Sequence, residues 1–535
     1  MGYQQFGRVM IGGIRVYRPH VNSELRFKEN VLSHLRKCKW TAELTTAKDV
    51  NSAVQYLYNY CHGEFVNSIR VLGSRHACEF LLYQSDNWER IRLAHSEGKL
   101  TPEESDFWNR YGISARRAIW FALENMVALE PNEEPTVSKD EIIWATDRVM
   151  ISAEIMVQTA GQSTMAYAVF PDDTVLSVRP DNPQEYFRFR LTPLLEARKE
   201  KFFSRRSTPV PPQYRLFATS ECETVPKALD SVFLEEHGIT LTQIIHAAIY
   251  ADRYSRKAEG SGFDTRFVLE DTVMKATALN LSVPIERLAP VFQAFILTPE
   301  TAKNREFWKP KQEQRIIRRP FLRMPHDLGP HLAWVSPIIE GAVGQRLQDL
   351  SFRKCPPEWE TSKITSELTS FSQRLDLEWN REVHNQFIQR GLRGEMGIKR
   401  LGSVRLESDS GPGEIDGLYV DPSDGSLIVV EVKRTQPGFD PDYWRGEMDD
   451  YLRRKNCYVN KHKKKIAWTR SNWTLVCQHF IDHGLLDSMP ANSPRIKAVI
   501  VTKYPSLVSI ACQDLPILSL AWVLEDFDLQ GKWPF

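Results

Sequence analysis

The segment GEIDGLYVDPSDGSLIVVEVKRT, residues 413–435, constrains the fold more than any other part of the chain. Two apolar runs flank the turn-forming residues DPSDG, which predicts a β-hairpin with strands near 413–421 and 426–434. The second run, SLIVVEV, is apolar at nearly every position and is typical of a strand buried on both faces. Because unpaired charge is costly in such a strand, Glu431 and Lys433 need partners.

The charged residues of this hairpin suit one kind of chemistry. Side chains alternate between the faces of a strand, so Glu414 shares a face with Asp416, and Glu431 shares a face with Lys433. Two carboxylates gathered with one ammonium group suit a divalent cation beside a phosphate, which indicates metal-dependent phosphodiester cleavage. The alternative is a surface ion pair at a strand end, which would contribute well under ~1 kcal/mol. Glu414 lies either beside this site or in solvent.

Asp416, fourteen intervening residues and then Glu431-Val432-Lys433 on a valine-rich strand resemble the motif of the PD-(D/E)XK nuclease superfamily. The E-x-K half of the motif is intact. Ile415 stands before Asp416, where the motif has proline. Only the carboxylate takes part in the chemistry, so this departure leaves the expected function unchanged.

The resemblance covers roughly the last 160 residues. It implies that the C-terminal domain, residues 365–535, has a restriction-endonuclease-like core, in which helices flank a mixed β-sheet. The hydrophobic pattern by itself predicts the same α/β order. That order is a long amphipathic helix in LTSFSQRLDLEWNREVHNQFIQRGL, strands near 398–406, 413–421 and 426–434, a helical stretch, and further strands in RIKAVIVTKYP and ILSLAWVLEDF.

Magnesium prefers hard oxygen ligands and keeps several waters, so few protein ligands suffice. Asp416 and Glu431 are the expected ligands, and the resemblance adds the backbone carbonyl of Val432. Lys433 is expected to orient or help deprotonate the attacking water and to offset charge on the phosphate. The resemblance further implies that Mn²⁺ substitutes for Mg²⁺ and that the products carry 5′-phosphate and 3′-hydroxyl ends.

Members of this superfamily often place a glutamate on the helix before these strands. The resemblance therefore adds Glu382 to the catalytic and metal-binding residues. Glu378 lies four residues earlier and shares the same helical face, so the choice between the two stays open, with Glu382 preferred. A solvated helix face is the alternative for both residues.

Residues 453–470, RRKNCYVNKHKKKIAWTR, contain eight basic side chains, interleaved aromatic residues and no acid. Basic groups neutralise phosphates and aromatic rings stack on bases, so this segment predicts a nucleic-acid-binding surface. DNA is the expected partner, and RNA is not excluded. A solvated charged helix is the alternative. The residues assigned to this surface are Arg453, Arg454, Lys461, Lys463, Lys464 and Lys465.

The rest of the chain predicts two further domains. Residues 1–205 form a mainly helical domain with a β element at 147–191, and residues 215–355 form an α+β domain. The proline-rich segment at 204–214 and the segment at 354–362 are the expected boundaries. We expect these regions to act in substrate recognition or regulation, and to bind a partner protein or a second copy of the chain.

Composition narrows the class of protein. Eight scattered cysteines without any CxxC argue against a zinc site and against a disulfide framework, as in a reducing compartment. No apolar run reaches the ~20 residues of a membrane helix, so we expect a cytoplasmic protein without a membrane partner. An arginine cluster at 315–323 is interpreted either as a phosphate contact or as the polar face of a strand.

The sequence therefore predicts a Mg²⁺-dependent DNA endonuclease of the kind found, by analogy, in bacterial defence and mobile-element systems. The alternative is a nucleic-acid-binding or scaffold protein that keeps the nuclease fold without catalysis.

Overall fold

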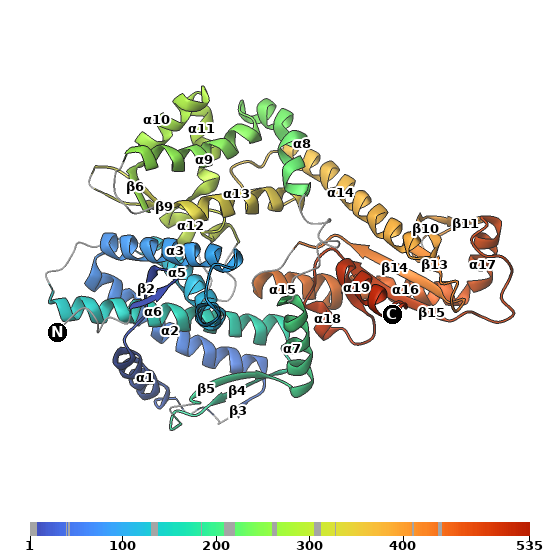
Figure 1. Ribbon diagram of the computed structural model, residues 1–535, viewed down its shortest axis with the longest axis horizontal. Coiled ribbons are helices and arrows are strands. Elements are labelled where there is room, and N and C mark those ends of the chain that lie inside the picture. The colour runs from blue at the N-terminus through green and yellow to red at the C-terminus, as the bar shows by residue number, and fades with distance from the viewer. Residues whose placement is uncertain are drawn as a thin grey trace. The chain divides into compact units, whose positions relative to one another are not determined.

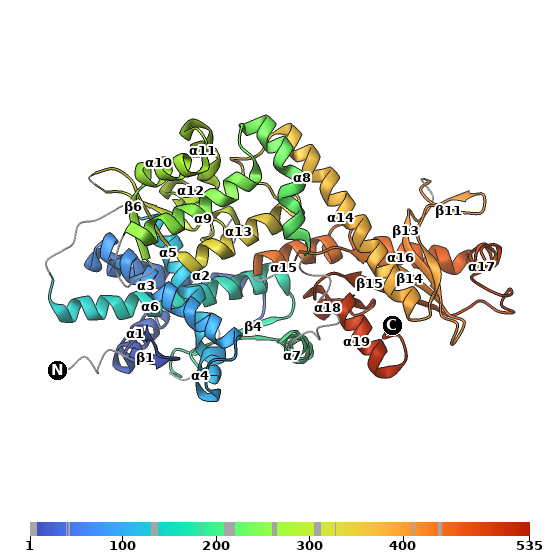
Figure 2. The same ribbon diagram turned by 45° about the horizontal axis from the view of Figure 1, so that its top comes forward.

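The computed structural model describes residues 8–38, 40, 43–129, 137–182, 185–207, 220–258, 265–303, 312–326, 328–408, 411–436 and 441–535 (Figures 1 and 2). The chain is mixed α/β and divides into two compact units. Unit 1 contains Met1–Tyr167, Pro171–Arg190 and Cys222–Leu368, and unit 2 contains Ala168–Phe170, Leu191–Glu221 and Thr369–Phe535. Within the described residues, no helix combines the length and the apolar character that crossing a bilayer requires.

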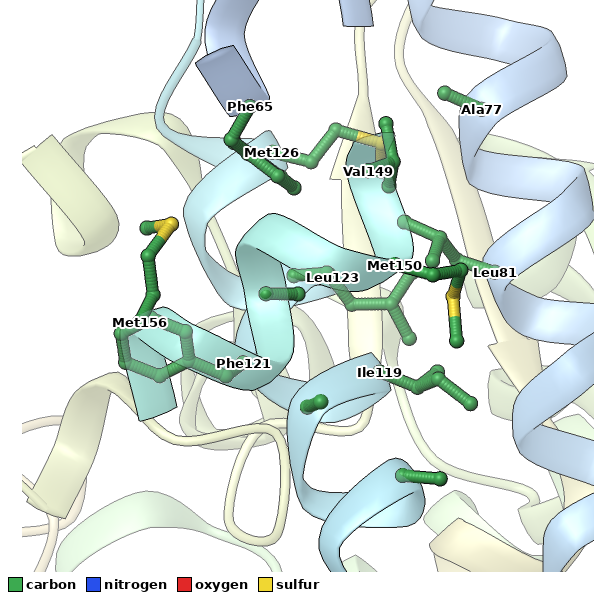
Figure 3. Packing of buried hydrophobic residues seen from close by; sticks show 14 of the residues in the cluster. Phe65, Ala77, Leu81, Ile119, Phe121, Leu123, Met126, Val149, Met150 and Met156 are labelled. Carbon is green, nitrogen blue, oxygen red and sulfur yellow. The ribbon is translucent and has the colours of Figure 1, made fainter. Parts of the chain in front are cut away.

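The N-terminal part of unit 1 is a helical assembly around one hydrophobic core. Its elements are β1 (Arg8–Ile11), β2 (Ile14–Tyr17), α1 (Val21–Leu35), β3 (Glu43–Leu44), α2 (Ala47–Leu72), α3 (Ser74–Ser96), α4 (Pro102–Phe107), α5 (Ile113–Val127), α6 (Lys139–Thr164), β4 (Thr174–Val178) and β5 (Phe187–Leu191). Figure 3 shows side chains from α2, α3, α5 and α6 interdigitating, among them Phe65, Leu81, Ile119 and Val149. Burial of these apolar faces stabilises the helices far more than their intrinsic propensities do.

Helix α6 corrects part of the predicted β element at 147–191. The run RVMISAEIMV, whose alternation predicted a strand, is helical, and the capping box of Ser138 and Glu141 fixes the start of α6. α6 packs against both α2 and α5, so the helix is apolar over most of its circumference. The hydrophobic pattern of such a segment does not distinguish the period of a helix from that of a strand. Among the described residues of 147–191, only β4 and β5 are strands, and they form a sheet with the short β3.

The later part of unit 1 contains α8 (Ser220–His237), α9 (Leu241–Ala258), β6 (Thr265–Leu269), α10 (Glu270–Leu281), α11 (Ile285–Phe292), β7 (Ile296–Leu297), α12 (Pro299–Lys303), β8 (Phe321–Met324), β9 (His331–Val335) and α13 (Ser336–Ser351). The strands form a four-stranded sheet in the order β6-β9-β8-β7. Leu322 and Val335 belong to the same hydrophobic cluster as Phe27 and Trp88. The segments predicted as separate domains, 1–205 and 215–355, thus share one core, apart from Ala168–Phe170 and Leu191–Glu221, which belong to unit 2.

The two predicted boundaries have different outcomes. Residues 208–214 of the predicted linker lie outside the described residues. The segment 354–362 does not separate the units, since the Trp359 side chain is fully buried in unit 1 against Phe233 and Phe295. The division instead falls at Leu368, inside the long helix α14 (Ser362–Gln389).

Unit 2 is built on a five-stranded mixed sheet in the order β10-β13-β14-β15-β16. The strands are β10 (Arg393–Ile398), β13 (Ile415–Val420), β14 (Leu427–Lys433), β15 (Ile496–Thr502) and β16 (Ile517–Ser519). Strands β10, β13 and β14 are antiparallel neighbours, whereas β14, β15 and β16 are parallel. The predicted hairpin at 413–434 is confirmed, and β14 is buried as SLIVVEV indicated.

Two predicted strands of unit 2 need correction. The strand expected at 398–406 lies earlier, as β10, and only the short pair β11 (Arg400–Leu401) and β12 (Val404–Arg405) follows it. The segment ILSLAWVLEDF is a strand only up to Ser519 and then continues as helix α19 (Leu520–Gln530). Its apolar residues Val523 and Leu524 pack on the sheet, which explains why a helix resembled a buried strand in the sequence.

Helices cover both faces of this sheet (Figure 2). Helices α14 and α19 pack against the face that carries Tyr419, Val430 and Val432, which we call the α14 face. Helices α16 (Tyr458–Ser471) and α17 (Trp473–Asp482) pack against the face that carries Leu418 and Val429, which we call the α16 face. The remaining helices of unit 2 are α7 (Pro193–Ser207), α15 (Pro441–Met448) and α18 (Val508–Ala511). The period of two along a strand therefore decides which helix each side chain meets.

Candidate active site

The register of β13 and β14 brings two carboxylates together. Leu418 pairs with Val429 and Gly417 pairs with Val430, so the next positions along the ladder are Asp416 and Glu431. Because Asp416 is two residues from Leu418, it projects to the α16 face, as does Glu431. The backbone N–H of Val432 donates a hydrogen bond to Asp416 Oδ2 at 2.9 Å and fixes this carboxylate at the strand end.

Two ammonium groups lie against both carboxylates. Lys433 Nζ is 2.6 Å from Glu431 Oε1 and 3.4 Å from Asp416 Oδ2. Lys465 Nζ, from α16, is 2.5 Å from Glu431 Oε2 and 3.4 Å from Asp416 Oδ1. The side chains of Glu431 and Lys465 are 4% and 8% exposed, whereas those of Asp416 and Lys433 are 14% and 22% exposed. The cluster is thus closed on the α16 side and reaches solvent at Asp416 and Lys433.

The opposite charges of the cluster stabilise each other's ionised forms. Burial alone would raise the pKa of Glu431, but the adjacent Lys433 and Lys465 outweigh it and lower that pKa. Burial would likewise lower the pKa of Lys433, but Glu431 and Asp416 outweigh it and raise that pKa. The ion pair of Glu431 and Lys433 is therefore held in its charged form at neutral pH.

A polar stripe on α16 faces this cluster. Tyr458, His462, Lys465 and Thr469 follow the spacing of one helical face, and His462 and Thr469 are fully buried. His462 Nδ1 lies 3.8 Å from Glu431 Oε2, and neither ring nitrogen of His462 has a hydrogen-bond partner among the described residues. Burial lowers the pKa of His462 to about 4, so this imidazole is neutral at pH 7. An orphaned buried imidazole beside a charge cluster is typical of a functional site.

Tyr458 and Arg434 hold the end of β14 in place. Lys433 Nζ lies 4.9 Å from the centroid of the Tyr458 ring, a cation–π distance. Arg434 projects to the α14 face, where its Nε donates to Asp376 Oδ1 at 2.7 Å and its Nη2 donates to Ser372 Oγ at 2.9 Å. The alternation of Lys433 and Arg434 thus anchors the strand end to the helix layers on both faces.

Three of the four predicted catalytic residues come together, namely Asp416, Glu431 and Lys433. Glu382 does not join them. It lies on α14, whose buried residues pack on the opposite face of the sheet, and it accepts a hydrogen bond from Gln386 Nε2 at 3.0 Å. The α14 carboxylate tied to β14 is instead Asp376, through Arg434.

The structure also describes the other candidate residues on and near the hairpin. Glu378 is exposed on α14. Glu414 pairs with Lys399 at 3.2 Å near the surface. Val432 contributes its N–H to the site, and the role of its carbonyl as a metal ligand stays a prediction.

The predicted nucleic-acid-binding residues divide into three groups. Lys465 is buried in the cluster rather than exposed on a basic surface. Other side chains have protein partners: Arg453 donates to the carbonyl oxygens of Ala168 and Val169, Arg454 pairs with Asp450, and Lys463 pairs with Asp514. Lys461 and Lys464 are exposed on α16.

The arginine cluster at 315–323 is structural. Arg318 forms a bidentate pair with Asp349, with Nε–Oδ2 at 2.6 Å and Nη2–Oδ1 at 3.0 Å, and both side chains are 2% exposed. Arg323 forms a similar pair with Glu270. These guanidinium groups are occupied inside unit 1, which excludes the interpretation of the cluster as an exposed phosphate contact.

His462 was missed as a site residue, and Lys465 was assigned to the nucleic-acid-binding surface instead of this cluster, because both stand among exposed lysines. Their spacing from Tyr458, four and seven residues, is the signal that could have found them. Fold and site together define a mixed α/β protein with a partly buried carboxylate–lysine cluster at the end of a central strand. Comparisons of this chain with protein-family models, with curated proteins and with solved structures gave no match.

Proposed function

We propose that unit 2 is a metal-dependent endonuclease with a restriction-endonuclease-like core, which hydrolyses phosphodiester bonds of DNA. The observation that supports this most is the approach of Lys433 Nζ to both Asp416 and Glu431, within 3.4 Å, at the end of a central strand. The order of antiparallel and parallel strands in the sheet agrees with the fold that the motif implies. RNA is the second substrate class to test.

The two carboxylates fit a divalent cation. Lys465 Nζ contacts both of them, so positive charge is already favourable in the space that they share. Asp416 and Glu431 offer the hard oxygen ligands that Mg²⁺ and Mn²⁺ prefer, and the Val432 carbonyl is the third expected ligand. The cation, when bound, would polarise the phosphate and lower the pKa of an attacking water.

The protein side chains have distinct roles in this proposal. Lys433 is the most exposed member of the cluster, and its ammonium group would contact the scissile phosphate or the attacking water. Lys465 is buried and would keep Glu431 ionised. His462, neutral at pH 7, would leave the charge of the cluster unchanged.

The exposed lysines of α16 provide the expected contact with the nucleic-acid backbone. Lys461 and Lys464 lie on the helix that supplies Lys465, so their positive charge is near the cluster on the same element. Such contacts strengthen binding without reading sequence. We assign substrate recognition or regulation to unit 1, by analogy with defence and mobile-element nucleases.

One observation favours the alternative, a nucleic-acid-binding or scaffold protein without catalysis. Glu431 is paired with two ammonium groups, so the cluster is balanced without a metal ion. A protein of that kind would bind DNA in a salt-dependent way, with no requirement for a divalent cation.

A cleavage assay decides between the two functions. The full chain is incubated with supercoiled plasmid, linear duplex, single-stranded DNA and RNA, in Mg²⁺, in Mn²⁺ and in EDTA. We expect cutting of DNA with either metal ion and none in EDTA. Asp416→Asn is expected to abolish cutting, because it removes a charged metal ligand, whereas Glu414→Gln on the same strand face is the matched control. Undiminished cutting by Asp416→Asn would refute the proposed site.

A further inference from the structure

A second group of metal-binding side chains lies in unit 2, on residues that the proposed nuclease chemistry does not use. Glu395 projects from the edge strand β10, His479 from α17, and His483 directly follows the end of that helix. One ligand atom from each of the three residues lies within 4.8 Å of the other two. Among the residues that the structure describes, this is the one group of three or more potential ligands that meets that distance.

The two histidines are placed side by side by helical geometry. Residues four apart lie on the same face, and the His479 and His483 ring centroids are 4.1 Å apart. His479 Nε2 is 3.0 Å from Glu395 Oε2, so the strand carboxylate already reaches the first imidazole. These contacts join the C-terminal end of α17 to the edge of the sheet.

A hydrogen bond sets the tautomer of the second imidazole. His483 Nδ1 is 2.7 Å from the backbone carbonyl oxygen of His479. Since a carbonyl only accepts, Nδ1 carries the proton, and Nε2 keeps its lone pair for a ligand. Donation from the remote nitrogen to a backbone carbonyl is the usual support of a metal-bound histidine.

We propose that Glu395, His479 and His483 form a binding site for a transition-metal ion of the Zn²⁺ class. Two imidazoles and one carboxylate make up a common three-ligand set for zinc, with a fourth position for water. Mg²⁺ prefers oxygen ligands and is a poor match for this group. His483 is exposed and the other two residues are partly buried, so the group is open to solvent. No cysteine among the side chains that the structure describes belongs to this group.

The metal ion would link α17 to the edge of the sheet. Glu395 pairs across the ladder with Leu418 on β13, the strand that also carries Asp416. Holding Glu395 to the end of α17 therefore protects an exposed edge strand and restrains β10 against β13. The site does not require that the protein cleave nucleic acid, so it is tested separately.

Titration of the full chain with Co²⁺ in the absence of Zn²⁺ and Mg²⁺ tests the proposal, because Co²⁺ in a four-coordinate site with imidazole ligands absorbs visible light far more strongly than hydrated Co²⁺ does. We expect one equivalent of Co²⁺ to produce the absorption bands and Zn²⁺ to displace it. The melting temperature of the protein is expected to rise with Zn²⁺. His483→Ala, at an exposed position, is expected to weaken Co²⁺ binding by about 100-fold or more, since loss of a ligand exceeds the ~10–100-fold loss of an outer-shell partner.

Two further variants complete the test. Glu395→Gln keeps a hydrogen-bonding group near His479 and removes the carboxylate ligand, so weakened binding in a folded variant would reflect coordination. Asp416→Asn removes a ligand of the proposed catalytic centre and is expected to keep the visible bands of Co²⁺ bound at Glu395, His479 and His483, which separates the two sites. The proposal is overturned if the parent shows no visible bands, or if His483→Ala and Glu395→Gln both bind Co²⁺ as tightly as the parent.

Discussion

Each unit contains a buried cluster of opposite charges, and the two clusters are built differently. In unit 1, the planar guanidinium of Arg318 meets Asp349 with two parallel hydrogen bonds, and Arg346 meets Glu313 in the same way. In unit 2, the point charges of Lys433 and Lys465 converge on the same two carboxylates, Asp416 and Glu431.

The difference shows how a structural ion pair differs from a candidate chemical site. The bidentate geometry of arginine fixes one partner, and Gln345 also donates to Asp349, which leaves little capacity for a ligand. Lysines are single points of charge on flexible stems, so they can leave a carboxylate when a cation takes their place, and they can turn to pair with a phosphate. The cluster of unit 2 also reaches solvent at Lys433, whereas Arg318 and Asp349 are both 2% exposed.

The largest expected effect is on the stability of unit 1. Asp349→Ala removes the carboxylate that pairs with the buried Arg318 charge, which we expect to lower the free energy of unfolding by about 3 to 5 kcal/mol. Urea denaturation followed by circular dichroism measures the change. Asp271→Ala, which removes an exposed ion pair with Lys275, is the control and is expected to cost less than about 1 kcal/mol. If the two variants have equal effects, the buried pair of Arg318 and Asp349 stabilises unit 1 no more than an exposed ion pair does, and the prediction is contradicted.

The matching experiment in unit 2 is expected to change activity rather than stability. Lys433→Met should lower the single-turnover cleavage rate by about 10²- to 10³-fold, because it removes a positive charge next to the developing charge of the phosphate. The melting temperature should change little, since Lys465 still pairs with Glu431. Lys399→Met, which removes a lysine outside the cluster, is the control and should leave the cleavage rate unchanged. A large loss of stability with unchanged cleavage would make this cluster structural, like that of unit 1.

A smaller effect concerns pH. His462 has an ordinary pKa of 6.5 and a pKa of about 4 in the folded protein, so the folded state resists its protonation. Its contribution to stability is complete above pH 6.5 and is lost as the pH falls from 6.5 toward 4. His462→Leu should reduce the loss of stability across that window by up to about 3 kcal/mol. Unfolding of parent and variant at several pH values measures it, with Thr469→Val as the non-titrating control on the same helix face. If the stability of His462→Leu falls with decreasing pH as steeply as that of the parent, the prediction is contradicted.

The smallest effect concerns the surface of α16. Replacing both Lys461 and Lys464 with glutamine should weaken DNA binding equally for all sequences and lower the salt dependence by about one phosphate contact per lysine. Binding isotherms at several salt concentrations measure this. Lys99→Gln, at an exposed residue of unit 1, is the control and should leave the salt dependence of DNA binding unchanged. If the double variant has the same salt dependence of DNA binding as the parent, these lysines do not contact the DNA backbone.

Local patterns predicted the centre of unit 2 well. The turn residues at 421–425 and the alternation along β13 and β14 are short-range features, and they place Asp416, Glu431 and Lys433 at one end of the hairpin. The same reasoning failed for α6 and for α19, since a helix buried on most sides has no polar stripe to show its period.

The amino-acid sequence by itself determined the hairpin, the buried character of its second strand and the charged triad, because neighbours along the chain and across a tight turn fix these features. Only the tertiary structure decided which distant residues complete the cluster. Packing of α16 on one face of the sheet brings Lys465 and His462 to Glu431, and packing of α14 on the other face keeps Glu382 away. The choice of face depends on how whole apolar surfaces are buried against one another, and no local pattern contains that information.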